Sequence, residues 1–173
     1  AQTLDARIAD AQGESKWITG GSARQRVHEW RAESNAVLIG SGTAIADDPS
    51  LTVRHTDGEQ PFRLVLDRRL RIAESAKLVS DEFAEKTIIF CRADLFESEK
   101  SHALRESGAQ IVALSEPDSE KQIFELLDHL GGMGIAQVLL EGGSELFSSF
   151  LEGGAVDKVA LFIAPKVFGH GAN

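Results

Sequence analysis

The chain has 173 residues, of which 42% are hydrophobic and 26% are charged, and its formal net charge is −9. This length corresponds to about one domain, and the composition excludes collagen-like, low-complexity and disordered classes. The acidic balance excludes general affinity for nucleic acid, and a single cysteine, Cys91, excludes an internal disulfide and a multi-cysteine metal site. No apolar run approaches the ~18–20 residues that span a bilayer. We therefore expect no nucleic-acid partner, no membrane partner and a cytoplasmic location.

Short apolar runs alternate with helical patterns along the chain. The runs that predict strands are residues 36–40, 62–67, 87–91, 110–114, 137–141 and 158–164. The patterns that predict helices are residues 22–34, 99–107, 118–130 and 144–152. Several strands are almost continuously apolar, which is typical of strands covered on both faces. The sequence predicts an α/β fold, a three-layer α/β/α sandwich with a mainly parallel central sheet.

The first predicted helix follows a tryptophan, Trp17. Thr19 or Ser22 is the expected N-cap of this helix. Trp17 is able to stack on a ligand ring or to pack in the core, and packing is the default interpretation.

A glycine pair follows the strand predicted at residues 137–141. Glu141-Gly142-Gly143 closes that strand, and Ser144 opens the next helix. Ligands of open α/β sheets lie at the carboxyl ends of strands, and helix N-termini offer free N–H groups to a phosphate. The alternative is a tight turn in which the glycines only allow the backbone conformation and contact no ligand.

A second glycine-rich segment, residues 40–45, follows the strand at residues 36–40. It begins like a dinucleotide fingerprint, but Ile45 stands where the third glycine belongs. We expect no clear helix after it, because residues 46–49 end in proline. The segment either lines a pocket or forms a simple turn.

Charged residues cluster after this segment. Asp47 and Asp48 are able to act as acid and base, or to form a turn before Pro49. Arg31 and Arg54 suit bidentate contacts to a phosphate or carbonyl, or surface ion pairs. The histidines show no metal-ligand spacing, and Cys91 is expected to be a small core residue.

These pieces together resemble the reductase domain of the bifunctional riboflavin biosynthesis deaminase/reductase, which has the dihydrofolate-reductase-like fold. The segments that carry the resemblance, in order, are residues 3–7, 13–19, Arg31, residues 43–54, 65–67, 141–143 and 164–166. They include Ala46-Asp-Asp-Pro-Ser-Leu-Thr-Val-Arg54 and cover nearly the whole chain.

The resemblance implies NADPH-dependent reduction of the ribose of 5-amino-6-(5-phosphoribosylamino)uracil. No metal is implied, because the nicotinamide carries the chemistry. The implied substrate contacts are Ser15, Arg31, Leu51, Arg54 and Glu141, with Glu141 also the candidate catalytic acid. The implied cofactor contacts are Ala1, Trp17, Thr43, Asp47, Arg68, Gly143, Ser144, Glu145, Leu146, Phe147, Ser148 and Ser149. The implied partners are the phosphorylated pyrimidine ribosylamine, a second copy in a homodimer, and a zinc deaminase domain, fused or separate.

Three departures from the family pattern are visible. Ala6 stands at a usual glycine, so a backbone with positive φ there would be strained. Arg68 stands where a small polar residue is common, and it either favours the 2′-phosphate of NADPH or faces solvent. We also expect residues 1–173 to be a single reductase domain that lacks the family's first and last strands. The alternatives are a related reductase of different substrate, such as a dihydrofolate reductase-like enzyme, and a non-catalytic nucleotide-binding or dimerisation module.

Overall fold

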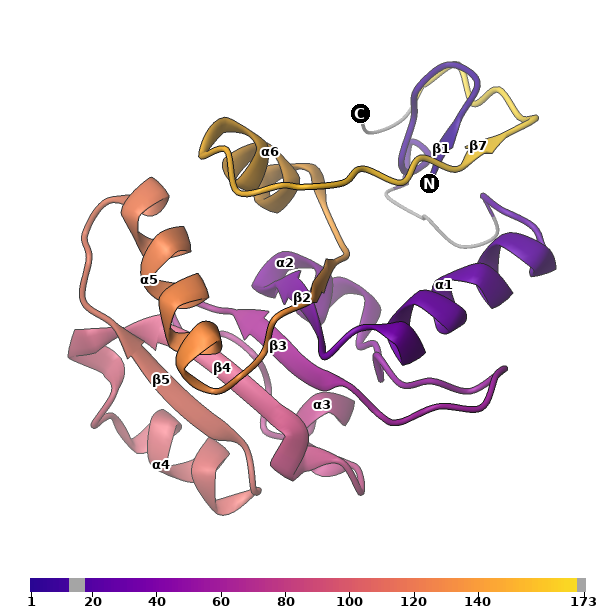
Figure 1. Cartoon of the computed structure of the whole chain (residues 1–173). Helices are drawn as coiled ribbons and strands as arrows, with labels where there is room; N and C mark the ends of the chain where they lie inside the picture. The colour runs from indigo at the N-terminus through magenta and orange to yellow at the C-terminus, as the bar shows by residue number, and fades with distance from the viewer. Residues whose placement is uncertain (13–17, 171–173) are drawn as a thin grey trace.

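The computed structural model describes residues 1–12 and 18–170, without the side chains of residues 119 and 120. At its centre lies a sheet of five parallel strands (Figure 1). They are β2 (Ala36–Gly40), β3 (Phe62–Leu66), β4 (Thr87–Arg92), β5 (Gln110–Leu114) and β6 (Val138–Leu140). The spatial order is β5-β4-β3-β2-β6. The predicted parallel sheet is confirmed, and each strand boundary differs from the predicted one by at most one residue.

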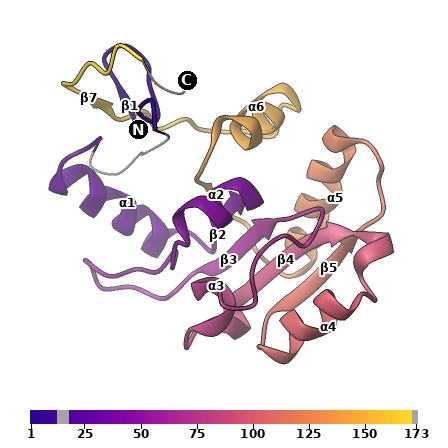
Figure 2. The same ribbon diagram turned by 180° about the vertical axis from the view of Figure 1, so that it is seen from behind.

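Helices cover both faces of this sheet (Figures 1 and 2). The helices are α1 (Gly21–Glu33), α2 (Ser41–Asp47), α3 (Lys77–Ser80), α4 (Glu99–Glu106), α5 (Ser119–Gly132) and α6 (Ser144–Glu152). One core contains Val37, Ile39 and Val65 with residues of α2, α3 and α4. The other contains Leu38 and Leu64 with residues of α5 and α6. Successive strand residues thus enter opposite cores, as the two-residue period of a strand requires, and the predicted three-layer sandwich is confirmed.

The order of the strands creates a switch point between β2 and β6. The chain moves from β2 through β3 and β4 to β5, and then returns over the other face with α5. It next adds β6 on the opposite side of β2, pairing Ala36 with Val138. Adjacent strands at such a point lead their following segments to opposite faces, which opens a crevice at their carboxyl ends. The end of β2 and the end of β6 are therefore where a ligand is expected.

The two ends of the described chain form a small second sheet. In it, β1 (Gln2–Thr3) pairs in parallel with β7 (Ile163–Ala164), beside α1 and apart from the large sheet (Figure 1). The Trp30 and Phe162 rings, 5.3 Å apart, join α1 to this region. Short 3₁₀ turns, η1 (Ala84–Lys86) and η2 (Ala93–Leu95), flank β4.

Three predictions about local structure are wrong. The strand expected at residues 158–164 is reduced to β7, because only its last two residues find a β partner among the described strands. A helix, α2, does follow Gly40; Asp48 ends it with φ 40°, so Pro49 lies beyond the helix and does not prevent it. The N-cap of α1 is Gly20 and not Thr19 or Ser22, and it makes no side-chain cap bond.

Ala6 adopts the strained conformation that its position suggested. Its φ is 59°, in the left-handed region that glycine adopts freely. The turn around it is held by hydrogen bonds between Thr3 and Arg7, with the Arg7 amide donating to the Thr3 hydroxyl over 3.0 Å. Asp5 adds a tie to the far end of the chain by accepting from the Phe168 and Gly169 amides.

Candidate active site

A two-point ion pair between Arg31 and Glu141 lies at the switch point. Arg31 Nε donates to Glu141 Oε1 over 2.7 Å, and Nη2 donates to Oε2 over 2.8 Å. Glu141 directly follows β6, and its amide continues the ladder to Leu38 of β2. The side chains are 11% and 22% exposed, so the pair is sheltered but reachable. Residues 110 positions apart are thus brought together at the carboxyl end of the sheet.

Arg31 also positions the loop that follows α2. Its Nη1 donates to the Thr52 carbonyl over 3.1 Å. Within the described part of the chain these bonds use three of its five N–H groups, which leaves two for a ligand. No sequence pattern marks Thr52, because its contribution is a backbone oxygen that any residue supplies.

The same loop holds Leu51 and Arg54 in different environments. Leu51 is 2% exposed and has a φ of 52°, so its side chain belongs to the core and its backbone is strained. Arg54 is exposed, as a residue that grips a soluble phosphate must be. Gln60 pins the segment between them by donating to the Val53 carbonyl over 3.0 Å and accepting from the Val53 amide over 2.8 Å. The loop is thus a fixed platform for Arg54.

The glycine turn after Glu141 requires glycine at one position. Gly142 has a φ of 117°, and a Cβ there would lie 2.8 Å from Thr43 Oγ1 of α2. Gly143 has an extended backbone, and a Cβ there would lie 3.9 Å from the same oxygen. The turn therefore packs against Thr43, which places this predicted cofactor residue beside the predicted phosphate-binding turn.

The predicted cofactor residues after Gly143 have different exposures. Ser144, Glu145, Phe147 and Ser148 are exposed at the start of α6. Leu146 is buried in the core beneath α5 and α6, so only its backbone is available to a ligand. Gly143 is the N-cap of α6 and makes no side-chain cap bond. The first N–H groups of this helix are therefore available to an anion.

A tight, basic turn follows β3 at the same edge of the sheet. Asp67 is fully buried and accepts from the Ile72 amide over 2.8 Å, which closes the turn. The turn carries Arg68, partly buried, and Arg71, which donates to the Ser41 hydroxyl at the start of α2 over 2.7 Å. The turn that carries Arg68 thus lies next to the segment that carries Thr43.

The remaining predicted site residues lie at the margins or outside the described part. Ser15 and Trp17 fall outside the described residues. Ala1 lies near Glu141. Asp47 is exposed at the end of α2.

Cys91 is buried at the end of β4, where burial raises its pKa to about 11. The predicted core role is confirmed, since such a thiol is protonated and unreactive at neutral pH. Within residues 1–12 and 18–170, no three His, Cys, Asp or Glu side chains gather as metal ligands. In the same described part, no helix has the length and hydrophobicity to cross a membrane.

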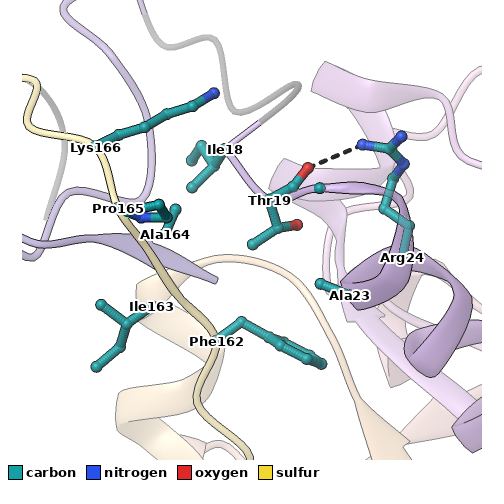
Figure 3. A pocket seen from close by; sticks show the side chains of 10 residues that line it. Ile18, Thr19, Ala23, Arg24, Phe162, Ile163, Ala164, Pro165 and Lys166 are labelled. Atoms are coloured by element: carbon teal, nitrogen blue, oxygen red, sulfur yellow. Dashed lines mark hydrogen bonds between the residues drawn. The ribbon is translucent and has the colours of Figure 1, made fainter.

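A separate hollow of about 530 Å³ lies between the start of α1 and β7, and we call it the α1–β7 pocket (Figure 3). It is lined by apolar side chains such as Ile18 and Phe162, with Arg24 donating to the Thr19 carbonyl at its rim. None of the predicted substrate or cofactor residues of the described part lines it. The chemistry of the switch point, and not the size of this hollow, therefore identifies the candidate active site.

Known proteins match this chain over its whole length. The family model described as the RibD C-terminal domain matches residues 1–173. A riboflavin biosynthesis protein RibD from Aquifex aeolicus is 40% identical over the whole chain, which covers 47% of that protein. A 2,5-diamino-6-ribosylamino-4(3H)-pyrimidinone 5′-phosphate reductase from Methanothermobacter thermautotrophicus is 39% identical over 98% of the chain, which covers 76% of that protein. The chain thus spans about half the length of the RibD relatives that it matches.

Solved structures lead to the same family. A diaminohydroxyphosphoribosylaminopyrimidine deaminase/5-amino-6-(5-phosphoribosylamino)uracil reductase from Thermotoga maritima superposes with a TM-score of 0.81 at 36% identity. The match covers 99% of this chain and 45% of that one. The riboflavin biosynthesis reductase Rib7 from yeast, at 21% identity and a TM-score of 0.64, shares the fold.

Proposed function

The chain belongs to the RibD C-terminal domain family, and from this premise we propose that it reduces 5-amino-6-(5-phosphoribosylamino)uracil with NADPH. In this reaction the nicotinamide supplies a hydride to C1 of the ring-opened ribose, the imine nitrogen takes a proton, and the ribitylamino product forms. The observation that carries the proposal is that the Arg31–Glu141 ion pair and the Gly142–Gly143 turn lie side by side at the switch point.

The substrate side of the site is assigned to Arg31, Arg54 and Glu141. Arg31 keeps N–H groups free for polar atoms of the substrate while its other donors fix Glu141 and the Thr52 carbonyl. Arg54, exposed on the loop that Gln60 pins, suits the substrate phosphate. Glu141 is held at two oxygens beside the reacting sugar and is the proposed source or relay of the proton. Ser15 and the backbone of Leu51 complete the proposed substrate contacts.

The cofactor side is assigned to the two glycines, Thr43 and the start of α6. A Cβ at Gly142 would fill the space against Thr43, so the turn leaves its backbone open to a close-lying phosphate. The free N–H groups after Gly143 suit the pyrophosphate of a dinucleotide. Asp47, Trp17 and Ala1 are the other proposed cofactor contacts.

The choice of NADPH over NADH is assigned to the basic turn after β3. The side chains of Arg68 and its neighbour Arg69 make no hydrogen bond or ion pair among the described residues, in a chain of net charge −9. Unpaired guanidinium groups at the sheet edge suit a 2′-phosphate. Arg68→Ser is therefore expected to lower the affinity for NADPH while leaving that for NADH unchanged, which fluorescence titration measures. Equal loss for both cofactors would remove Arg68 from this role.

We also propose a homodimer, a cytoplasmic location, and cooperation with a zinc deaminase domain. Several large apolar side chains are exposed around β7, which supports a protein contact there. They are Leu4, Val159, Leu161, Ile163 and Val167, each more than half exposed. The Thermotoga relative, whose name includes both activities, supports the deaminase partner. Sedimentation at micromolar concentration tests the dimer, and a monomer would refute it.

The substrate is tested by turnover. NADPH oxidation is measured with the phosphoribosylaminouracil, with the diaminopyrimidinone that the Methanothermobacter relative's name contains, and with dihydrofolate. Turnover with the first supports the proposal. Turnover with the second alone would mean that reduction precedes deamination. Turnover with dihydrofolate alone refutes the proposal.

A further inference from the structure

A buried histidine lies beside the substrate arginines without an assigned role. His28 precedes Arg31 by three residues on α1, so the two side chains share one helix face. It is 6% exposed, and its Nδ1 is buried without a hydrogen-bond partner in the described structure. A buried polar nitrogen without a protein partner is uncommon, and this one is able to accept a hydrogen bond or a proton.

The surroundings of His28 are rich in positive charge. Its ring meets the His55 ring edge-on, with centroids 4.7 Å apart. The groups that act on it are Arg31 on its own helix and Arg54 and His55 on the facing loop, with Glu141 beyond Arg31. Burial first, and then Arg31, His55 and Arg54, lower the pKa of His28, while a backbone hydrogen bond with Thr52 opposes them. The imidazole is therefore neutral at neutral pH in the free protein.

We propose that His28 couples binding of the substrate phosphate at Arg54 to the uptake of one proton. The inference rests on the proposed function, because it takes Arg54 as the residue that receives the phosphate. The anion cancels the field of Arg31 and Arg54, a proton moves from solvent to the unpartnered Nδ1, and the resulting imidazolium attracts the anion in turn. His28 acts through charge, so it is a specificity-determining residue that favours an anionic ligand over a neutral sugar.

The sign of the coupling follows from linkage. The bound anion raises the pKa of His28, so proton uptake accompanies binding at pH values between the free and bound pKa. Within this window, the affinity for the anion rises as pH falls, by at most about tenfold per pH unit for one proton. Above the window His28 stays neutral in both states, and the slope disappears.

Sulfate is the probe that isolates this coupling, because it carries two negative charges and does not itself titrate in this range. Titration calorimetry of the chain with sulfate, at several pH values and in two buffers of different ionisation enthalpy, measures both affinity and proton uptake. The wild type is expected to take up part of a proton and to bind more tightly as pH falls. His28→Gln is expected to lose both effects, and Arg54→Gln to lose the binding.

Two histidine variants serve as controls. His55→Gln is expected to keep the pH slope; if it loses the slope and His28→Gln keeps it, the proton goes to His55 and the inference is wrong. His102→Gln, on an exposed face of α4, is expected to change nothing. If the His28 variant does not fold, nuclear magnetic resonance of the wild-type His28 ring replaces it, and an unchanged ring pKa with sulfate bound overturns the inference.

Failure of this inference is distinguishable from failure of the proposed function. A chain that oxidises NADPH with the substrate, but whose KM has the same pH profile in wild type and His28→Gln, retains the function and loses the coupling. A chain that binds sulfate with proton uptake, but oxidises no NADPH, retains the coupled anion site and loses the reductase assignment.

Discussion

Arg63 and Arg31 each hold a carboxylate at two points over the same distances, but in different surroundings. Arg63 of β3 donates to Asp81 over 2.7 and 2.8 Å, and also to the Ser50 and Leu78 carbonyls. Its side chain is 1% exposed, whereas that of Arg31 is 11% exposed. Four hydrogen bonds from the enclosed Arg63 guanidinium are made within the protein, so the first pair joins parts of the fold. The second keeps free donors and faces the crevice, which is what a binding site requires.

The largest effect on stability is expected from Asp81→Ala. The substitution leaves the guanidinium of Arg63 buried without its counter-ion, which costs about 3–5 kcal/mol in the free energy of unfolding. Urea unfolding measures this cost. The matched control is Asp94→Ala, which breaks the exposed Arg92–Asp94 pair and is expected to change stability by less than about 1 kcal/mol. Equal effects would show that the two pairs do not differ as described.

Glu141→Gln is expected to affect activity strongly and stability less. It keeps the shape of the side chain but removes its charge and its proton chemistry, so kcat/KM should fall by about 100-fold or more. The free energy of unfolding should change less than in Asp81→Ala, because the Arg31 pair is partly solvated. Steady-state kinetics and unfolding of the same sample give both values. Full activity in the variant would remove Glu141 from the reaction.

The glycine turn beside the Arg31–Glu141 pair is tested by two adjacent substitutions. Gly142→Ala forces an alanine to φ 117° and against Thr43 Oγ1, and is expected to cost about 1–3 kcal/mol of stability. Gly143→Ala meets no close atom and has a favourable backbone, so it should be nearly neutral for stability. Adding Thr43→Ala to Gly142→Ala relieves the contact but not the backbone strain, so it should restore only part of the loss. Equal destabilisation by the two alanines would contradict the described turn.

A smaller, pH-dependent effect is expected from His28, which shares a helix face with Arg31. Its pKa in the folded state lies below the usual 6.5, so the unfolded chain binds the proton first. Its contribution to stability is complete above pH 6.5 and decreases as pH falls toward the folded-state pKa. Unfolding at a series of pH values should show this decrease in wild type and not in His28→Gln. The same slope in both proteins would assign it to another group.

The smallest effect is expected at the chain ends. Hydrogen bonds from the Thr3 hydroxyl and from the Gly169 and Phe168 amides lower the pKa of Asp5 to about 2. The stability that this tie contributes is present above pH 3.8 and is lost as pH falls through about 2. Asp5→Asn should speed hydrogen exchange of the Phe168 and Gly169 amides without changing that of β3. Unchanged exchange at both amides would show that the tie is weak.

The sequence predicted the parts of the fold that local pattern determines. β2 to β5 are short runs of apolar residues between polar ends, so their period and length identify them before any partner is known. The strand at residues 158–164 was predicted by the same apolar pattern, but a strand needs a hydrogen-bonding neighbour, and only residues 163 and 164 have one. The sequence pattern does not predict α2, because Pro49 argues against a helix there, whereas the helix ends at Asp47, before the proline.

In the candidate site too, local sequence pattern predicts some features and not others. The place of Glu141-Gly142-Gly143 between a strand and a helix predicts a turn, and the backbone forms a turn there. That Arg31 pairs with Glu141, and that Thr52 contributes a carbonyl, depends on the crossing of elements far apart in the chain. The three-residue spacing between His28 and Arg31 is visible in the sequence and places both on one helix face. That Arg54 and His55 lie near His28 on a facing loop is visible only in the structure.

The proposed reductase activity is tested by following NADPH oxidation with 5-amino-6-(5-phosphoribosylamino)uracil in the wild type, Glu141→Gln and Asp94→Ala. We expect steady oxidation that depends on the substrate in the wild type and Asp94→Ala, and near-complete loss in Glu141→Gln with its fold intact. The absence of substrate-dependent oxidation in a wild-type protein that binds NADPH, or full activity in Glu141→Gln, would contradict it.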